Sequence, residues 1–353
     1  MTSLSLAMGS PKSGPMGVYI KSQFLTKPQS APPGTDLAGR VAIITGASSG
    51  LGFHACRHLL SLGLSRLVMA VRSPQKGSAA ASTLRAEYPA ATIDVWPLEM
   101  SSYDFILSFV RRVESADELP RLDIAILNAA VIKTEFAIVP ATGHETTIQV
   151  NYLSTALLAI LLLPSLRSKS PPNSPGRLTI VNSTAAYALT LPNRSAVPFL
   201  SSFDDQTKTP YLFFDRYCTS KLLMHMFLVR LATHVDPEDV VVNIVDPGYC
   251  KGSGLHRETK GIVACGFAAA KTLTGRSTEE GAWTYVDAAV VKGGESHGCF
   301  VIDWKIGSFA KFVYEPDAGL VIDRLWQETI AELEFAKVAN ILGLNKKDGG
   351  ETS

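Results

Sequence analysis

The chain has 353 residues, of which 46% are hydrophobic, and its formal net charge is +1. A chain of this length and apolar content can bury a substantial core, in one large α/β domain with extensions or in two small domains. Because lysines and arginines are scattered and nearly balanced by acids, we expect no basic surface for nucleic acid or for an anionic membrane.

The first 35 residues differ from the rest of the chain. They contain three lysines, no acid and many Ser, Pro and Gly residues. This composition predicts a leader or arm outside the core, within which 18–25 is a candidate for docking on the domain surface. The stretch has no secretory apolar region and no arginine, although its lack of acids leaves an organelle-targeting role open. At the other end, the polar residues 345–353 predict a flexible tail.

Residues 36–344 alternate between two kinds of pattern. Short apolar runs typical of strands occur at 41–45, 66–71, 92–98, 124–128, 178–182 and 240–245. Helical patterns occur at 51–62, 78–88, 102–114, 145–163, 217–234 and 279–291. Strands that are apolar on both faces and alternate with helices predict a single α/β domain, a doubly wound parallel sheet with helices on both faces.

The cysteines and histidines predict neither a disulfide framework nor a metal site. The five cysteines are odd in number and form no CxxC pair, and no histidine lies at ligand spacing from cysteines or acids. Reduced, partly buried thiols are typical of intracellular proteins, so we expect a cytoplasmic location. The apolar run 156–164 is about half as long as a membrane span, so it predicts a buried helix and no spanning segment.

The first strand runs into a glycine-rich turn, Thr45–Gly52 (TGASSGLG). Glycines permit a tight turn and a close approach of the backbone to a pyrophosphate, and the N-terminus of the following helix attracts an anion. Such a turn alone is often only structural, but a strand before it and a helix after it favour a dinucleotide site. The binding residues expected here are Gly46, Ser48, Ser49, Gly50, Leu51 and Gly52.

The end of the second strand indicates NADP as the cofactor. An NAD site places an acid there to hold the ribose 2′-hydroxyl, but residues 51–86 contain neither Asp nor Glu. Arg72 directly follows the strand and Lys76 comes one helical turn later, where both can bind a 2′-phosphate. Two solvated surface cations are the alternative, and the missing acid counts against it.

Tyr217 and Lys221 are spaced to lie on one face of a helix, one turn apart. A tyrosine titrates near ~10, and a nearby ammonium typically lowers such a pKa by ~1–3 units. The pair is therefore a candidate general acid and base near neutral pH. Taken alone, this spacing is common by chance on protein surfaces.

These sites and further motifs together resemble the short-chain dehydrogenase/reductase superfamily over about residues 37–255. The glycine-rich turn is followed, in the family's order, by LNAA (127–130), Asn151, Ser183, YCTSK (217–221) and Pro247-Gly248. The resemblance implies a Rossmann-type fold and hydride transfer between NADP(H) and a carbonyl or alcohol carbon. The segment RLVMAVRS (66–73), the long stretch 184–216 and, more loosely, RLWQETIAEL (324–333) most resemble the retinol-dehydrogenase-like and protochlorophyllide-reductase-like branch, among fungal members linked to secondary metabolism.

The resemblance implies a catalytic set. Tyr217 would donate or accept the proton, and Lys221 would bind the nicotinamide ribose and lower the Tyr217 pKa. Asn151 would hold a water of the proton relay. Ser183 would hydrogen-bond the substrate oxygen, with the neighbouring Thr184 as the alternative hydroxyl.

It also implies cofactor contacts beyond the glycine-rich turn. Asn128 would stabilise the central strand near the adenosine ribose, and Glu99 stands where the family usually has an Asp that contacts the adenine. After the Pro-Gly turn, Cys250 would offer only its backbone to the carboxamide. The family's usual Thr falls at Gly252, with Ser253 next to it, which leaves that contact open.

Ser183 and Tyr217 are 34 positions apart, more than is usual in the family, and the insert 184–216 is rich in aromatic residues. Because the insert borders the substrate in this fold, we expect it to form an apolar wall for a bulky, weakly polar substrate. In this fold residues 251–278 form the substrate lid, and the apolar stretch 261–272 falls within them. The alternatives for this stretch are an ordinary buried helix and a hairpin that contacts a membrane.

Three functions fit this sequence. The first is reduction of an apolar ketone or aldehyde, and the second is the reverse oxidation of an alcohol, because the cofactor pool sets the direction. The third is a catalytically idle dinucleotide-binding sensor or scaffold, which would have no need for Asn151, Ser183, Tyr217 and Lys221 together. The partners expected are a small-molecule substrate and, as a candidate assembly, a second copy in a homodimer.

Overall fold

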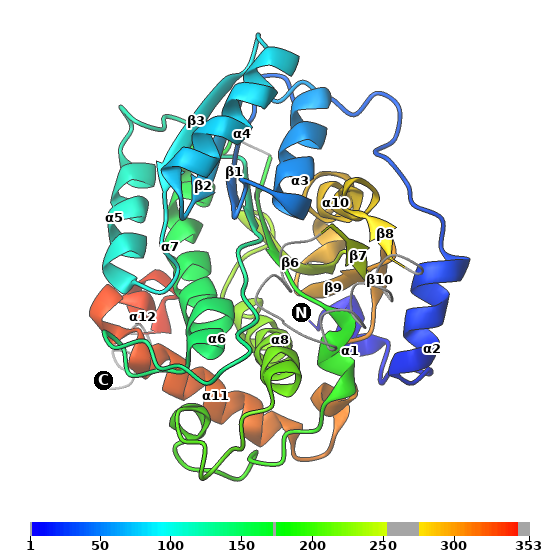
Figure 1. Ribbon diagram of the computed structural model, residues 1–353, viewed down its shortest axis with the longest axis vertical. Coiled ribbons are helices and arrows are strands. Elements are labelled where there is room, and N and C mark those ends of the chain that lie inside the picture. Colours follow the sequence, from blue (N-terminus) through cyan, green and yellow to red (C-terminus); the bar gives the residue numbers. More distant parts are fainter. Residues whose placement is uncertain (1, 172–173, 253–274, 345–353) are drawn as a thin grey trace, which may run out of the picture.

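The computed structural model describes residues 2–171, 174–252 and 275–344, and its frame is one large sheet (Figure 1). Eight strands follow the order β10-β9-β6-β5-β4-β1-β2-β3, and all neighbours are parallel except the β9–β10 hairpin at one edge. The chain crosses from β3 at the far edge to β4 beside β1, which creates a switch point between β1 and β4. This topology confirms the doubly wound Rossmann-type α/β fold.

The strands of this sheet are Val41–Thr45 (β1), Arg66–Val71 (β2), Thr92–Pro97 (β3), Ile124–Leu127 (β4), Gly176–Val181 (β5), Val240–Asp246 (β6), Cys299–Ile302 (β9) and Lys305–Gly307 (β10). A small second sheet pairs Cys250–Lys251 (β7) with Arg276–Ser277 (β8). The sequence predicted β1 and β2 with these same bounds, but it did not predict β9 or β10.

The α-helices are Leu4–Ala7 (α1), Pro15–Ile20 (α2), Gly50–Ser61 (α3), Pro74–Glu87 (α4), Tyr103–Glu114 (α5), Thr146–Ile148 (α6), Ser154–Lys169 (α7), Phe213–Leu231 (α8), Thr278–Val286 (α10), Ala318–Glu332 (α11) and Val338–Ile341 (α12). π-Helical turns cover Lys21–Leu25 (η1), Gln149–Leu153 (η2) and Asp287–Val291 (η6). Short 3-10 turns include Thr184–Ala188 (η3) and Leu200–Phe203 (η4).

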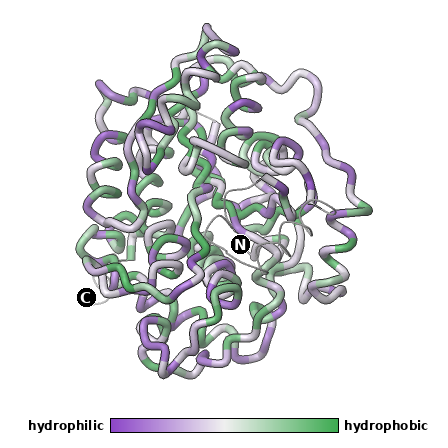
Figure 2. The backbone as a smooth tube through the Cα atoms, in the orientation of Figure 1, coloured by the Kyte–Doolittle hydropathy of each residue, from purple (hydrophilic) through white to green (hydrophobic). Residues whose placement is uncertain are grey.

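The core forms two layers, one on each face of the sheet. Alternate residues of β1 point to opposite faces, so Ile43 joins the layer that holds α5, α7, α8 and α11. Ile44 joins the layer that holds α3, α4 and α10. Figure 2 shows hydrophobic residues concentrated toward the middle of the molecule and hydrophilic ones toward its margin. Both faces are apolar because helices cover both of them.

The apolar run 156–164 lies in α7, as a buried helix. Among the described helices, the continuous helical segment Thr146–Lys169 is long and apolar enough to cross a membrane by length and composition alone, and 94% of its most apolar window is buried inside the protein.

The N-terminal segment differs from the arm that its composition predicted. Ser5 is fully buried, and its hydroxyl donates to the Gly307 carbonyl at 2.6 Å and accepts from the Phe300 N–H at 2.9 Å. Helix α1 thereby lies against β9 and β10, and α2 lies against η3 (Figure 1). Serine hydroxyls satisfy buried backbone groups here, so a polar composition does not keep the segment away from the core.

The insert 184–216 also differs from its prediction. Its large apolar side chains Leu191, Phe199, Leu200 and Phe203 are buried in the core layer of α8 and α11. These four side chains therefore do not form the expected apolar wall, although Ala185, Ala188 and Phe214 of the same insert line the cavity at the carboxyl ends of the central strands.

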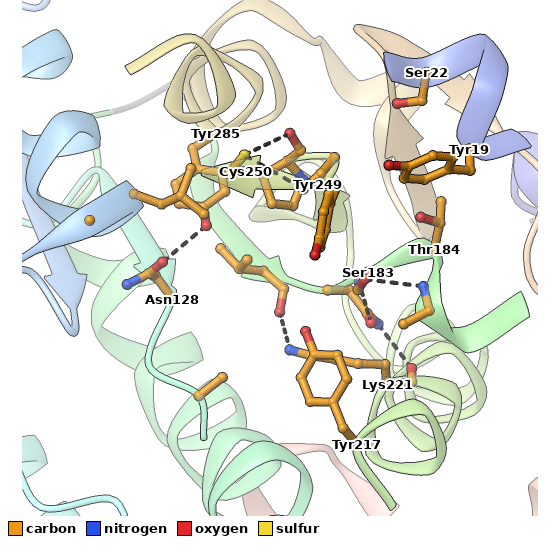
Figure 3. A pocket seen from close by; sticks show the side chains of 18 of the residues that line it. Tyr19, Ser22, Asn128, Ser183, Thr184, Tyr217, Lys221, Tyr249, Cys250 and Tyr285 are labelled. Atoms are coloured by element: carbon orange, nitrogen blue, oxygen red, sulfur yellow. Dashed lines mark hydrogen bonds between the residues drawn. The ribbon is translucent and has the colours of Figure 1, made fainter. Parts of the chain in front are cut away.

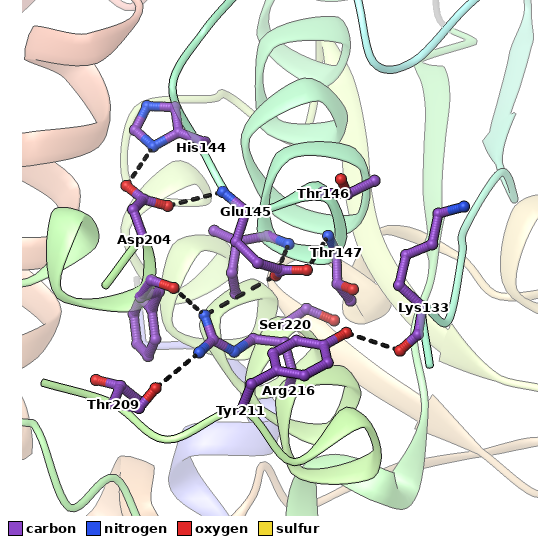
Figure 4. A network of polar contacts seen from close by, with 12 residues as sticks. Lys133, His144, Glu145, Thr146, Thr147, Asp204, Thr209, Tyr211, Arg216 and Ser220 are labelled. Atoms are coloured by element: carbon purple, nitrogen blue, oxygen red, sulfur yellow. Dashed lines mark hydrogen bonds and ion pairs between the residues drawn. The ribbon is translucent and has the colours of Figure 1, made fainter. Parts of the chain in front are cut away.

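Buried polar groups hold the insert in place (Figure 4). The Arg216 guanidinium donates to the Phe203 and Thr209 carbonyls and lies 3.9 Å from the Glu145 carboxylate. Glu145 in turn accepts hydrogen bonds from the first N–H groups of α6. An arginine with several fixed donors suits this task, because the carbonyls of a buried loop need partners.

A histidine joins the insert to two helices. His144, just before α6, places Nδ1 2.8 Å from an Asp204 carboxylate oxygen and Nε2 3.2 Å from a Glu332 oxygen of α11. Burial lowers the His144 pKa, but the two carboxylates outweigh burial and raise that pKa to about 9. The ring is therefore charged near neutral pH.

This arrangement predicts a pH-dependent stability. A histidine with a raised folded-state pKa contributes its full stabilisation below its unfolded value of 6.5 and loses that contribution as the pH rises through about 9. We expect the melting temperature to fall across this window more steeply than in a His144→Gln variant, in melts from about pH 6 to pH 10. Asp204→Asn should flatten the same window, and parallel curves for all three proteins would contradict the assignment.

Candidate active site

A cavity of about 550 Å³ opens at the carboxyl ends of the central strands (Figure 3). Its walls come from the glycine-rich turn, the LNAA segment, the end of β5, α8, the Pro-Gly turn and the N-terminal segment. This is the edge of a doubly wound sheet at which ligands bind, outside the switch point.

The glycine-rich turn fits a pyrophosphate in its backbone geometry. Gly46 and Gly50 have φ of +66° and +58°, which favour glycine. A Cβ at Gly52 would lie 2.6 Å from the Gly46 carbonyl oxygen, so only glycine fits there. Ser49 is the N-cap of α3 but its side chain makes no capping hydrogen bond, which leaves the first N–H groups of α3 for an anion. Leu51 also lines the cavity, while Ser48 lies half-buried within the turn.

Asn128 holds this turn against β4. Its side-chain N–H groups donate to the carbonyls of Thr45 at 2.8 Å and Gly46 at 3.3 Å, and its carbonyl accepts from the Tyr285 hydroxyl at 3.0 Å. The Asn128 amide is thus used to fix the shape of the turn. Sequence reasoning missed Tyr285, whose signal lay only in the helical pattern 279–291.

The predicted cations lie at the end of β2. Arg72 and Lys76 are exposed, and within the described ranges neither side chain makes an ion pair. Ser73 between them is the N-cap of α4, with Oγ accepting from the Lys76 N–H at 3.4 Å. Glu99, further along the edge, is half-buried, and one of its carboxylate oxygens accepts from both the N–H and the hydroxyl of Ser101.

The structure brings Ser183, Tyr217 and Lys221 to one side of the cavity (Figure 3). Tyr217 and Lys221 lie one turn apart on α8, with the Lys221 Nζ 5.6 Å from the centre of the Tyr217 ring. The Lys221 ammonium donates to the Val181 carbonyl at 3.0 Å, at the end of β5. Ser183 follows β5, and its hydroxyl acts as a hydrogen-bond partner that lowers the Tyr217 pKa.

The electrostatics of this pair differ from the sequence argument. Burial raises the pKa of Tyr217 well above its usual range, and the hydrogen bond with Ser183 acts against that effect. Burial also lowers the pKa of Lys221 to about 8, against the opposing effect of the Asp246 carboxylate. The direction of the Tyr217 pKa is therefore opposite to the one that the sequence argument expected, because removal from water raises the pKa of a phenol.

The two neighbouring hydroxyls have different surroundings. Thr184 donates two hydrogen bonds to the Asp246 carboxylate, from its N–H to one oxygen at 3.2 Å and from its hydroxyl to the other at 3.4 Å. The Ser183 oxygen caps η3 by accepting from the Ala185 N–H at 3.1 Å, which leaves its own proton for another acceptor. This difference favours Ser183 over Thr184 as the hydroxyl that faces a substrate.

Asn151 lies behind the cavity in η2, where it is buried. Its side chain accepts from the Val131 N–H at 2.8 Å and donates to the Val131 carbonyl at 2.9 Å and the Ser220 hydroxyl at 3.1 Å. Both side-chain amide protons already donate hydrogen bonds within the protein. If Asn151 holds the water of the proton relay, it must do so through another of its atoms. The amide itself ties the loop after β4 to α8.

The loop after β6 forms the remaining wall. Cys250 is buried, and its Sγ lies 3.4 Å from the Pro247 carbonyl. Gly252 has φ +79°, a conformation that the family's usual Thr would adopt only with strain. Ser253 and most of the predicted lid 251–278 lie outside the described residues, as does the predicted tail 345–353. Of the insert, Thr184, Ala185, Ala188 and Phe214 reach the cavity.

Asp246 is, besides Tyr285, a residue of this site that sequence reasoning missed. It ends β6 and is 2% exposed. Burial and the nearby Asp303 raise its pKa to about 6, while Thr184, Arg276 and the Gly248 backbone act in the opposite direction. The carboxylate is therefore ionised above about pH 6 and can keep Lys221 charged. Its sequence signal, an acid directly before Pro-Gly, is too short to distinguish it from a turn residue.

Comparisons with known proteins agree with this geometry. Residues 40–196 match the family model described as short chain dehydrogenase. The short chain dehydrogenase/reductase mfmJ of Annulohypoxylon moriforme is 52% identical over 92% of this chain and 93% of its own. The short chain dehydrogenase virL of Hypocrea virens is 44% identical, also over 92% and 93%. The chain belongs to the short-chain dehydrogenase/reductase family.

This result confirms the resemblance inferred from the motifs, and the relatives named above are fungal. Members of the family are oxidoreductases that bind a nicotinamide dinucleotide. Among solved structures, a short-chain type dehydrogenase/reductase from Mycobacterium marinum aligns with a TM-score of 0.59 at 18% identity, covering 80% of this chain and 98% of that chain. The Pseudomonas aeruginosa RhlG/NADP active-site complex aligns with a TM-score of 0.55 at 22% identity, over 81% and 100%. At these identities the alignments support the fold alone.

The Asp246–Lys221 interaction predicts a shift in pH dependence. Asp246→Asn removes the charge that opposes the desolvation of Lys221, so the Lys221 pKa should fall below about 8. The alkaline limb of the dinucleotide-dependent rate should then move to lower pH, as measured in a pH–rate profile.

Thr184→Val is the matched control, because it removes a hydrogen bond from Asp246 but no charge. We expect its alkaline limb to stay where it is in the unmodified protein. An unchanged limb in Asp246→Asn would show that this carboxylate does not set the charge of Lys221.

Proposed function

We propose that the protein is an NADP(H)-dependent oxidoreductase that transfers a hydride between the nicotinamide and a ketone, aldehyde or alcohol carbon of a bulky, mostly apolar small molecule. The observation that carries the proposal is the meeting of Ser183, Tyr217 and Lys221 at one cavity with the uncapped start of α3. A dinucleotide on that turn would extend from the glycines toward the phenol of Tyr217, as the family's chemistry requires.

The chain's own residues supply the proton chemistry. The dinucleotide, when bound, supplies or accepts the hydride at its nicotinamide ring. In reduction, Tyr217 donates its proton to the substrate oxygen, and the Lys221 ammonium stabilises the phenolate that remains. Ser183 donates a hydrogen bond to the same oxygen. Because burial raises the Tyr217 pKa, the phenol holds its proton near neutral pH, which suits the reductive direction. Oxidation reverses each of these steps.

The preference for NADP rests on the end of β2. Arg72, the Ser73 hydroxyl and Lys76 cluster where α4 begins, and a helix N-terminus adds further attraction for a phosphate. The acid-free stretch 51–86 offers no carboxylate for a ribose 2′-hydroxyl. The Pseudomonas neighbour is named as an NADP complex, which agrees with use of this cofactor by the fold.

A bulky apolar substrate is supported by the cavity lining. Pro15, Met16, Ala185, Ala188 and Phe214 contribute apolar side chains around the few polar groups near Tyr217. Such a mixture is typical of pockets in which apolar contacts give affinity and a few polar groups give orientation. The fungal relatives support a role in secondary metabolism, and we retain a cytoplasmic location as part of the proposal.

The function is tested with a panel of carbonyl compounds and alcohols, with NADPH and NADH consumption, and the reverse reactions, measured in parallel. Turnover of apolar carbonyls with NADPH is the expected result. Tight dinucleotide binding without turnover of any compound would favour the idle sensor or scaffold instead.

The catalytic assignment predicts distinct effects at three positions. Tyr217→Phe should lower kcat by ~10²–10⁴-fold, because general acid catalysis contributes about that much, and should leave cofactor binding intact. Ser183→Ala should also be nearly inactive, whereas Thr184→Val should retain activity because Thr184 serves Asp246. Steady-state kinetics and cofactor titrations measure both quantities. A Tyr217→Phe enzyme with more than about a tenth of the original rate, or a reversed order of the two hydroxyl variants, would refute these catalytic roles.

The cofactor assignment predicts a change of preference. A charge-assisted arginine contact is worth ~1.5–3 kcal/mol, or roughly 10–150-fold in affinity for NADPH over NADH. Arg72→Ala should remove most of this preference and Arg72→Asp should reverse it, measured as the ratio of the two dissociation constants. Lys76→Ala should cost less, since an ammonium contacts a phosphate as a point charge, whereas a guanidinium such as that of Arg72 can bind it with two hydrogen bonds. Equal affinity of the unmodified protein for the two dinucleotides would refute the preference.

A further inference from the structure

The N-terminal segment presents one helical face to the active-site cavity. Pro15, Met16, Tyr19, Ser22 and Gln23 line the cavity. Their spacing of three to four residues along α2 and η1 places them on one side of the helix. Figure 3 shows Tyr19 projecting from this helix toward Tyr249, on the same side of the pocket as Thr184. The segment therefore supplies a part of the cavity wall that the buried aromatics Phe199 and Phe203 of the insert do not form.

A buried polar cluster fixes this helix to the sheet. Ser22 is 3% exposed, and its hydroxyl donates to the Asp303 carboxylate at 2.7 Å. The Arg276 guanidinium donates to the same carboxylate oxygen at 2.6 Å, to the Ser22 hydroxyl at 3.2 Å and to the Ser22 carbonyl. A serine with a carboxylate and an arginine as partners has far less freedom than a residue of a surface arm.

The carboxylate of this cluster sits on an unusual turn. Asp303 and Trp304 join β9 to β10 with φ of +51° and +59°, a conformation that hairpins usually assign to Asn and Gly. The turn places the Trp304 ring 5.2 Å from the Arg276 guanidinium carbon and Asp303 within its hydrogen-bond reach. A non-glycine pair in this conformation is costly, so its surroundings must hold it in place.

The same cluster reaches the Pro-Gly turn of the active site. Arg276 also donates to the Pro247 carbonyl at 3.4 Å. A Cβ at Gly248 would lie 2.7 Å from an Arg276 nitrogen and 2.9 Å from the Gln23 side-chain nitrogen. The turn, the arginine and the helix thus pack without spare room, and Ser5 anchors the start of the segment to the same hairpin.

We propose that residues 15–23 are a specificity-determining wall of the substrate cavity, with Tyr19 as the side chain that contacts the substrate and Ser22 and Asp303 as positioning residues. The proposal rests on the function proposed above for this cavity. The Tyr19 ring lies edge to face with Tyr249 at 6.0 Å between centroids, so its orientation is set by the loop that follows the Pro-Gly turn. A flat, bulky apolar group bound near Tyr217 would meet this pair of rings.

The first test compares a bulky and a small carbonyl compound, 2-naphthaldehyde and propanal. Tyr19→Ala should lower kcat/KM for 2-naphthaldehyde by about tenfold or more through KM, because it removes an aromatic contact, and should change propanal little. Tyr19→Phe should restore the original ratio of the two values. Leu25→Ala is the matched control, since Leu25 is apolar, 74% exposed and outside the cavity lining.

A binding measurement separates this proposal from the proposed function. Calorimetric titration of 2-naphthol into protein loaded with the tighter-binding dinucleotide requires no turnover. We expect binding that weakens about tenfold in Tyr19→Ala and is unchanged in Leu25→Ala. Absence of turnover together with this pattern would refute the proposed function and support the wall. No binding to the unmodified protein, or equal binding by Tyr19→Ala, would overturn the wall whatever the activity.

The positioning residues are tested by a double-mutant cycle. Ser22→Ala and Asp303→Asn should each raise KM for 2-naphthaldehyde several-fold more than KM for propanal. The double variant should be no worse than the more severe single variant, because both changes release the same helix. Ser22→Thr, which keeps the hydroxyl, should restore KM. Additive effects, or equal losses for both substrates, would show general destabilisation and overturn the positioning role.

Discussion

Keeping the Lys221 ammonium charged inside the protein is the constraint on which this site depends. Its side chain is 4% exposed, and burial alone would drive such a group toward the neutral form. One backbone carbonyl at 3.0 Å satisfies a single N–H and supplies no net charge. The opposing charge comes from Asp246, which is itself buried and needs partners of its own.

Those partners form a chain of alternating sign. From Lys221 the order is Asp246, then Arg276, then Asp303, so each charge has an opposite charge as its neighbour. The two carboxylates oppose each other, which raises the Asp246 pKa, and Arg276 acts against that effect. The members of this chain come from four elements, α8, β6, β8 and the β9–β10 turn. Keeping Lys221 charged therefore requires these elements, and the N-terminal helix that contacts them through Ser22, to pack in one arrangement.

Much of this arrangement could be predicted from local patterns. Strands β1 and β2 are continuous apolar runs because helices cover both of their faces. Glycines stand in Thr45–Gly52 because the turn needs backbone conformations that other residues avoid. The spacing of Tyr217 and Lys221 likewise follows from the helix alone. Each of these signals lies within one element and needs no knowledge of its neighbours.

The features that the sequence did not predict depend on contacts between different elements. The aromatic content of the insert could not reveal that Phe199 and Phe203 turn toward α11, because composition carries no direction. The serines at 5 and 22 looked like arm residues, although each becomes the partner of a buried group. Strand β10 is three residues long and follows an atypical turn. The direction of the Tyr217 pKa could not be predicted, because burial, its main cause, depends on the whole fold.

The β9–β10 turn carries backbone strain as part of this arrangement. Two non-glycine residues at positive φ cost of order 1–3 kcal/mol each, and a glycine at either position would avoid that cost. A cation–π contact contributes about 0.5–2 kcal/mol and a charge-assisted hydrogen bond about 1.5–3 kcal/mol, so Trp304 and Asp303 roughly offset their own strain. Fold stability therefore gains little from this turn. What it provides is position, since it fixes Arg276 under the Pro-Gly turn and Ser22 behind the cavity wall. Because the strained turn adds so little to stability, its role is to hold the active site in shape.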